Sequence, residues 1–93
     1  MERRVLTEDE IASGLAGLSG WAVEKGMLTR KYTFANFAES LSFVNRVGEI
    51  AESMDHHPDI TFGWGYAQVS TTTHNRGGIT DIDFDLASKI DAL

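Results

Sequence analysis

The chain has 93 residues, of which 42% are hydrophobic and 24% charged, and its formal net charge is −6. This size and composition predict one globular domain, residues 1–93, with no room for a separate cofactor domain. The acidic balance argues against direct nucleic-acid binding, because phosphate recognition depends on clustered Lys and Arg. The chain has no cysteine, which excludes disulfides, thiolate chemistry and Cys-based zinc sites.

The N-terminal segment carries Arg3 and Arg4 without an apolar segment behind them, and no later run is long enough to span a membrane. We therefore expect a soluble, unexported protein, with the cytoplasm as its compartment. A chain this short buries only about 60% of the surface that its unfolded state exposes. Association into a homo-oligomer would hide more apolar area, and we expect it here.

A first helix is predicted from the segment around Thr7. Thr7 is suited to be its N-cap, and Glu10 stands where it completes a capping box. The glycines that follow weaken the helix, which we expect to end near Leu18.

Two strands are predicted next, at 21–23 and 28–34, because both segments are rich in aromatic and β-branched residues. A turn containing Gly26 joins them into a hairpin. Alternate residues of each strand are apolar, so each strand turns one face to a core. Arg30 falls on the apolar face of the second strand and is a mismatch.

A long helix is predicted from about Asn36 to Met54, because apolar residues recur there at spacings of three and four. Phe43 and Ile50 widen the apolar stripe. They indicate either contact with a partner subunit or a broad core face within the chain, and the sequence does not separate these alternatives. The residues of the predicted stripe are Phe37, Leu41, Val44, Val47, Ala51 and Met54.

A second hairpin is predicted from 60–62 and 66–73, with Gly63 and Gly65 bending the chain around Trp64. A final helix then begins at a second capping box, Thr80 with Asp83. The resulting order is α-β-β-α-β-β-α. This order predicts an α+β fold, with a four-stranded antiparallel sheet and helices packed on one face.

All three histidines of the chain lie within residues 52–74, where predicted elements end. His56 and His57 follow the long helix, Pro58 stiffens the turn, and His74 follows the last strand. Imidazole can both give and take a proton near neutral pH. If the hairpin brings these side chains together, they suit a dehydration, in which one group protonates a departing oxygen and another removes a proton from a neighbouring atom.

Two carboxylates are candidates to orient these imidazoles, Glu52 and Asp83. A carboxylate that is hydrogen-bonded to one ring nitrogen sets the tautomer of the ring and raises the basicity of the other nitrogen. Periodicity alone favours a solvated Glu52, and a capping role alone would account for Asp83.

The spacing of these residues resembles the signature of the pterin-4a-carbinolamine dehydratases. The pattern is Glu52, three residues, His56-His57-Pro58, five residues, Trp64, nine residues, His74, eight residues, Asp83. The resemblance extends through Phe34-Ala-Asn-Phe37, Phe43-Val-Asn-Arg-Val47 and the segment 72–80 to Leu86-Ala87. Position 64 is Trp where members often have Tyr.

The resemblance implies an enzyme that removes water from 4a-hydroxytetrahydropterin to give quinonoid dihydropterin, recycling the cofactor of aromatic amino-acid hydroxylases. It implies no metal or prosthetic group, and a homodimer or homotetramer. It assigns general acid/base roles to His56 and His74 and a contact with the pterin to His57. Trp21 matches a tryptophan that borders the pocket.

Other interpretations stay open. Trp21 and Trp64 could contact the substrate pocket, or they could be ordinary core aromatics, which is the commoner fate of tryptophan in a small domain. The chain could be a non-catalytic binding or dimerisation module that uses the wide apolar face of its long helix. The three histidines could also hold zinc.

Overall fold

The computed structural model describes residues 4–93, so Arg3 lies outside the described part. No helix within this part is long and apolar enough to cross a membrane. The predicted order of elements is confirmed. The elements are α1 (Glu8–Ala16), β1 (Ala22–Glu24), β2 (Met27–Thr33), α2 (Phe37–Met54), β3 (Asp59–Gly63), β4 (Tyr66–Thr71), the short 3₁₀ helix η1 (His74–Arg76) and α3 (Asp81–Asp91).

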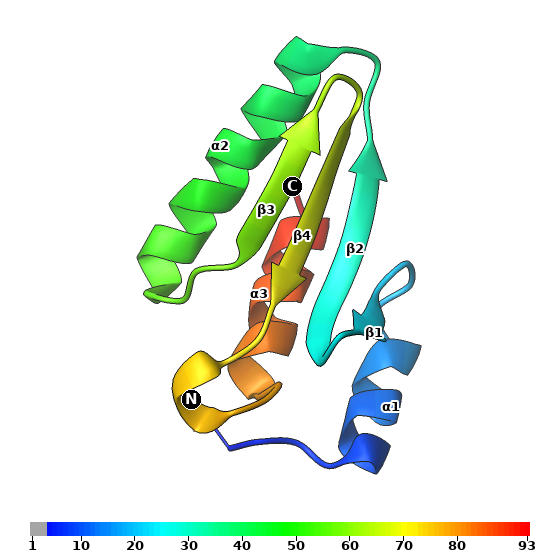
Figure 1. Ribbon diagram of the computed structural model, residues 1–93, viewed down its shortest axis with the longest axis vertical. Helices are drawn as coiled ribbons and strands as arrows, with labels where there is room; N and C mark the ends of the chain where they lie inside the picture. The colour runs from blue at the N-terminus through cyan, green and yellow to red at the C-terminus, as the bar shows by residue number, and fades with distance from the viewer. Residues whose placement is uncertain (1–3) are drawn as a thin grey trace.

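The four strands form one antiparallel sheet in the order β1-β2-β4-β3. Two hairpins build it, and β2 pairs with β4 in the centre, where Leu28 lies opposite Thr71. In Figure 1, α2 runs alongside β3, α3 lies behind β4, and α1 lies beside β1. The predicted fold class is therefore confirmed. The end of α2, the start of β3, the end of β4 and the start of α3 all lie toward one end of the molecule.

Side chains cap the starts of the first two helices. Thr7 caps α1, and its capping box with Glu10 is formed. A hydrogen bond from the Glu39 N–H to the side chain of Asn36 caps α2. α1 ends at Ala16, two residues before the predicted end, and β4 ends two residues before the predicted end of its strand.

The core-facing side of α2 differs in phase from the predicted stripe. Val47 and Ala51 are buried as expected, but so is Ser40, whereas Phe37 and Leu41 are 45% and 41% exposed. Phe43 is buried, and its ring packs on Tyr32 and Phe34 with ring centroids 4.6 and 5.1 Å apart. Phe43 therefore makes the contact within the chain that a broad core face predicts. Ile50 also packs against this core.

The mismatched Arg30 has a partner far along the chain. Its guanidinium donates to the Ser19 carbonyl at 2.8 Å and to the Asp91 carboxylate at 3.1 Å. Asp91 also accepts hydrogen bonds from the Tyr32 hydroxyl and from Trp21 Nε1, the latter at 3.0 Å. Burial, with a smaller effect of the neighbouring Asp91, raises the pKa of Tyr32 above its ordinary value. This cluster fastens the C-terminal end of α3 to β2.

Candidate active site

The three histidines line one pocket of about 300 Å³. α2 ends at Met54, and its C-cap residue Asp55 adopts the left-handed conformation (φ 50°) and turns the chain toward β3. His56 and His57 follow at once. His74 comes from the other side, where η1 begins after β4. The hairpin β3–β4 thus brings the two ends of the segment together, as predicted. The complete lining is Asp55, His56, His57, Thr72, Thr73, His74 and Asn75.

His56 is buried against the Asp83 carboxylate. Its Nε2 lies 2.6 Å from Asp83 Oδ1, and Asp83 itself is fully buried. Three further donors serve the same carboxylate. The Thr71 hydroxyl donates to Oδ1 at 2.6 Å, and the Thr73 hydroxyl and the Thr80 N–H donate to Oδ2, each at 2.9 Å. Asp83 therefore combines both proposed roles, since it completes the cap of α3 and contacts an imidazole.

His57 forms a second carboxylate–imidazole pair, in solvent. Its Nε2 contacts Glu52 Oε2 on the last turn of α2. The two side chains are 56% and 77% exposed. The expectation that Glu52 lies beside an imidazole is met, although the pair is held in water, where charges attract each other only weakly.

His74 is exposed and lies between two hollows. One is the histidine pocket. The other, of about 360 Å³, shares Thr72 and His74 with it and extends to the β1–β2 turn at Lys25 and Gly26. An imidazole in this position can reach a ligand that occupies either hollow.

The two tryptophans do not line the histidine pocket. Trp21 is buried in the core and donates to Asp91. Trp64 is 71% exposed in the turn between β3 and β4, and the length of that hairpin separates it from the histidines. Pro58 stands between His57 and β3, in the turn that it was expected to shape.

Sequence reasoning missed three parts of this site. The threonines of segment 66–73 were given no role at the site, because Thr is a β-forming residue and the segment is predicted to be a strand. Thr71 and Thr73 instead donate to the buried carboxylate. Asp55 was not singled out either. The position of Thr73 directly before His74 is the one signal that could have drawn attention to it.

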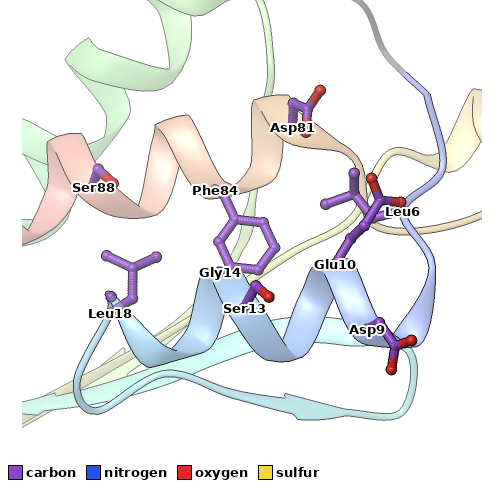
Figure 2. Close-up of a pocket in the computed structure, with 10 residues that line it drawn as sticks. Leu6, Asp9, Glu10, Ser13, Gly14, Leu18, Asp81, Phe84 and Ser88 are labelled. Carbon is purple, nitrogen blue, oxygen red and sulfur yellow. The ribbon is translucent and has the colours of Figure 1, made fainter.

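A larger hollow lies elsewhere, between α1 and α3. It measures about 610 Å³, and its lining includes Leu6, Asp9, Asp81 and Phe84, with the ring of Phe84 standing over Gly14 (Figure 2). It contains carboxylates but no imidazole. The histidine pocket is the candidate site, because proton transfer requires suitable groups and volume alone does not supply them. Within residues 4–93, no group of three or more His, Asp or Glu side chains is arranged to hold a metal ion.

Comparison with known proteins agrees with this geometry. The model of the family described as pterin 4 alpha carbinolamine dehydratase matches residues 4–93. The chain belongs to the pterin-4-alpha-carbinolamine dehydratase family. The resemblance that the spacing from Glu52 to Asp83 indicated is thereby confirmed.

Two relatives illustrate the membership, both named provisionally as pterin-4-alpha-carbinolamine dehydratases. The protein of Rubrobacter xylanophilus is 52% identical over 77 residues, which are 82% of this chain and 72% of the relative. The protein of Sulfurisphaera tokodaii is 43% identical over 88 residues, which are 95% of each chain.

Solved structures of this family fold are similar as well. The crystal structure of a transcriptional coactivator/pterin dehydratase from Brucella melitensis has a TM-score of 0.91 and 31% identity, covering 96% of this chain and 97% of its own. A pterin dehydratase-like protein identified as a RuBisCO assembly factor in the alpha-carboxysome has a TM-score of 0.63 and 22% identity, covering 77% and 83%. The second likeness concerns the fold alone.

Proposed function

We propose that the chain removes water from 4a-hydroxytetrahydropterin, giving quinonoid dihydropterin and so recycling the cofactor of aromatic amino-acid hydroxylases. The observation that carries this proposal is the convergence of His56, His57 and His74 on one pocket, with a buried carboxylate behind His56. Membership of the dehydratase family supports the choice of substrate.

The reaction needs two proton transfers. The bond between C4a and its hydroxyl oxygen breaks, and the oxygen leaves as water after taking a proton from an acid. The neighbouring ring nitrogen loses a proton to a base, and the electron pair of its N–H bond forms the new double bond to C4a. An imidazolium can supply the first proton and a neutral imidazole can accept the second.

The environments of the histidines suit different roles. In our proposal His56 and His74 act as the acid/base pair, since one is held rigidly by Asp83 and the other stands in solvent between two hollows. His57 binds the heterocycle, and Glu52 orients its ring. These transfers call on no metal or prosthetic group. Full activity in protein that metal analysis shows to be metal-free would support this part of the proposal.

The decisive experiment is an assay of carbinolamine dehydration by the purified protein at neutral pH. We expect clear acceleration over the uncatalysed rate, and His74→Ala should reduce kcat by about two to four powers of ten. Because the His74 side chain is exposed, this change should leave the unfolding temperature nearly unaltered. Trp64→Phe, at the far end of the hairpin, is the matched control and should retain full activity. Wild-type protein that fails to accelerate the reaction would refute the proposal.

A second function, as a protein-binding or self-associating module, has its own supporting observation. Phe37 and Leu41 expose apolar surface one turn apart on α2, and such surface favours association. We propose a homodimer or homotetramer that uses this surface. Phe37→Ser with Leu41→Ser should then yield monomers in analytical ultracentrifugation, and an unchanged mass would contradict the proposal.

A further inference from the structure

The Asp83 carboxylate is saturated by donors from four residues of the chain. Each oxygen accepts two hydrogen bonds, Oδ1 from Thr71 and His56, and Oδ2 from Thr73 and the Thr80 N–H. Both threonine side chains are buried, so water does not compete for these bonds. A buried carboxylate whose lone pairs are all used in this way has a single stable orientation.

This arrangement determines which nitrogen of His56 carries the proton. A carboxylate that accepts three other hydrogen bonds acts as an acceptor toward the ring as well, so Nε2 must be the N–H nitrogen in neutral His56. The contact of Nε2 with Thr71 Oγ1, at 3.3 Å, agrees. The single hydroxyl proton of Thr71 is already given to Asp83, so toward the ring this oxygen can only accept.

The other ring nitrogen, Nδ1, is then the one without a proton. Among the described residues Nδ1 has no hydrogen-bond partner. Every fully buried side-chain nitrogen or oxygen atom of these residues does have a partner, so Nδ1 is not fully buried. Nδ1 is therefore accessible, and His56 lines the histidine pocket. The lone pair that could accept a proton from a ligand is on this atom.

Thr73 links the same carboxylate to the loop of His74. Its hydroxyl donates to Asp83, and its backbone N–H donates to the Gly78 carbonyl at 3.0 Å, closing the loop that contains η1. The Thr73 and Thr80 hydroxyl oxygens lie 2.8 Å apart, and Thr80 is the donor because the Thr73 proton is in use. The position of His74, next to Thr73, is thus tied to that of Asp83.

We propose that Thr71 and Thr73 are positioning residues whose buried hydroxyls orient Asp83, so that His56 holds its proton on Nε2 and presents bare Nδ1 to the substrate. The part that concerns the substrate rests on the dehydratase function proposed above. Both hydroxyls are committed to the Asp83 carboxylate, and both side chains are almost fully buried.

The first test reads the tautomer in the ligand-free protein and needs no turnover. Nitrogen NMR of the imidazoles at a pH where they are neutral should show His56 as the Nε2–H tautomer. In Thr71→Val, which keeps the shape of the side chain and removes its hydroxyl, the Nδ1–H form should appear as well. An Nδ1–H tautomer in the wild type, or a spectrum unchanged in Thr71→Val, would overturn the proposal.

The second test is kinetic. Thr71→Val and Thr73→Val should each lower kcat about tenfold to a hundredfold, the effect of losing one hydrogen bond to a charged group, with KM changed less than twofold. Thr71→Ser restores the hydroxyl and should recover most of the rate. Thr29→Val is the matched control, because it removes a buried hydroxyl that bonds to Ser70 on β4 and not to Asp83.

The two tests separate the possible failures. If the tautomer shifts as expected but the wild type does not dehydrate the carbinolamine, the orientation of His56 by the threonines is supported and the proposed dehydratase function is refuted. If the wild type is active and Thr29→Val lowers kcat as much as Thr71→Val does, the hydrogen bonds to Asp83 have no particular effect on the rate, and the positioning proposal is refuted. If Thr71→Val does not fold, the proposal is still tested by two results: the Nε2–H tautomer of His56 in the wild type, and a kcat close to that of the wild type in Thr71→Ser.

Discussion

Two carboxylate–imidazole pairs lie at the same end of the molecule, and they differ in their exposure to solvent. His56 and Asp83 are buried and receive help from two threonines, whereas His57 and Glu52 are more than half exposed. In water a charge pair contributes little, because solvent screens it and both side chains lose freedom. In the interior the same pair must be complete, since a lone buried charge is very costly. Neighbouring histidines can therefore differ greatly in how firmly they are held.

The largest expected effect is that of Asp83→Asn. The amide cannot accept all four hydrogen bonds, so at least one buried donor would face an NH₂ group. Each buried donor that is left without its acceptor costs about 1–3 kcal/mol of stability. Urea unfolding followed by circular dichroism should show a correspondingly lower midpoint, and any folded fraction should lose kcat by about two to four powers of ten. A loss of stability below about 1 kcal/mol would contradict the prediction that the buried pair contributes more to stability than the exposed pair.

Glu52→Gln, at the exposed pair, should have a far smaller effect. We expect a loss of stability of about 1 kcal/mol or less, because the contact with His57 is solvated. The value of kcat should fall less than tenfold, since His57 keeps its place on the backbone. The same urea titration and the same assay measure both quantities. A loss as large as that of Asp83→Asn would show that Glu52 does more than orient an exposed ring.

Salt offers a way to compare the pairs without mutation of either histidine. The Debye length falls from about 10 Å at 0.1 M to about 3 Å at 1 M salt, and this screening reaches exposed charges first. The difference in stability between wild type and Glu52→Gln should therefore shrink in 1 M NaCl. The difference for Asp83→Asn should stay the same. Equal sensitivity of both differences would contradict the assignment of one pair to the interior.

The smallest effect concerns a third pair, Arg4 with Glu10 at the start of α1, where both side chains are exposed. Hydrogen bonds from Arg4, and then from the Thr7 N–H, lower the pKa of Glu10 from 4.5 to about 2. A lowered pKa in the folded state stabilises the protein above pH 4.5, and this contribution is lost as the pH falls toward 2. Glu10→Gln should lower the thermal midpoint slightly at pH 6, and the difference should decrease by pH 3. A difference that grows in acid would have the wrong sign.

Local features of this fold could be predicted from sequence, because they depend on neighbours along the chain. The capping boxes of Thr7 with Glu10 and of Thr80 with Asp83 are examples. The phase of α2 could not be predicted, because an apolar stripe broad enough to include Phe37 and Phe43 does not reveal which of its edges meets the sheet. The burial of Ser40 shows which side of α2 faces the sheet, and the pattern of apolar residues does not predict that burial.

In the candidate site, too, some features could be predicted from the sequence and others could not. Spacing alone brought out His56, His57 and His74, and the structure gathers all three at one pocket. The donors to Asp83 were hidden, because a strand rich in threonine is explained equally well by β propensity. Arg30 was visible as an anomaly, but its partner Asp91 is 61 residues away and only the tertiary fold joins them.

The close approach of α1 and α3 has a practical consequence for altering this protein. A β-carbon added at Gly14 would lie 2.5 Å from the Phe84 ring, so the ring would have to swing aside into the open space next to it (Figure 2). Larger residues at position 14 therefore call for a smaller one at position 84, and the two sites should be redesigned together. Because no histidine borders this space, it is a suitable place to attach a reporter dye away from the histidine pocket.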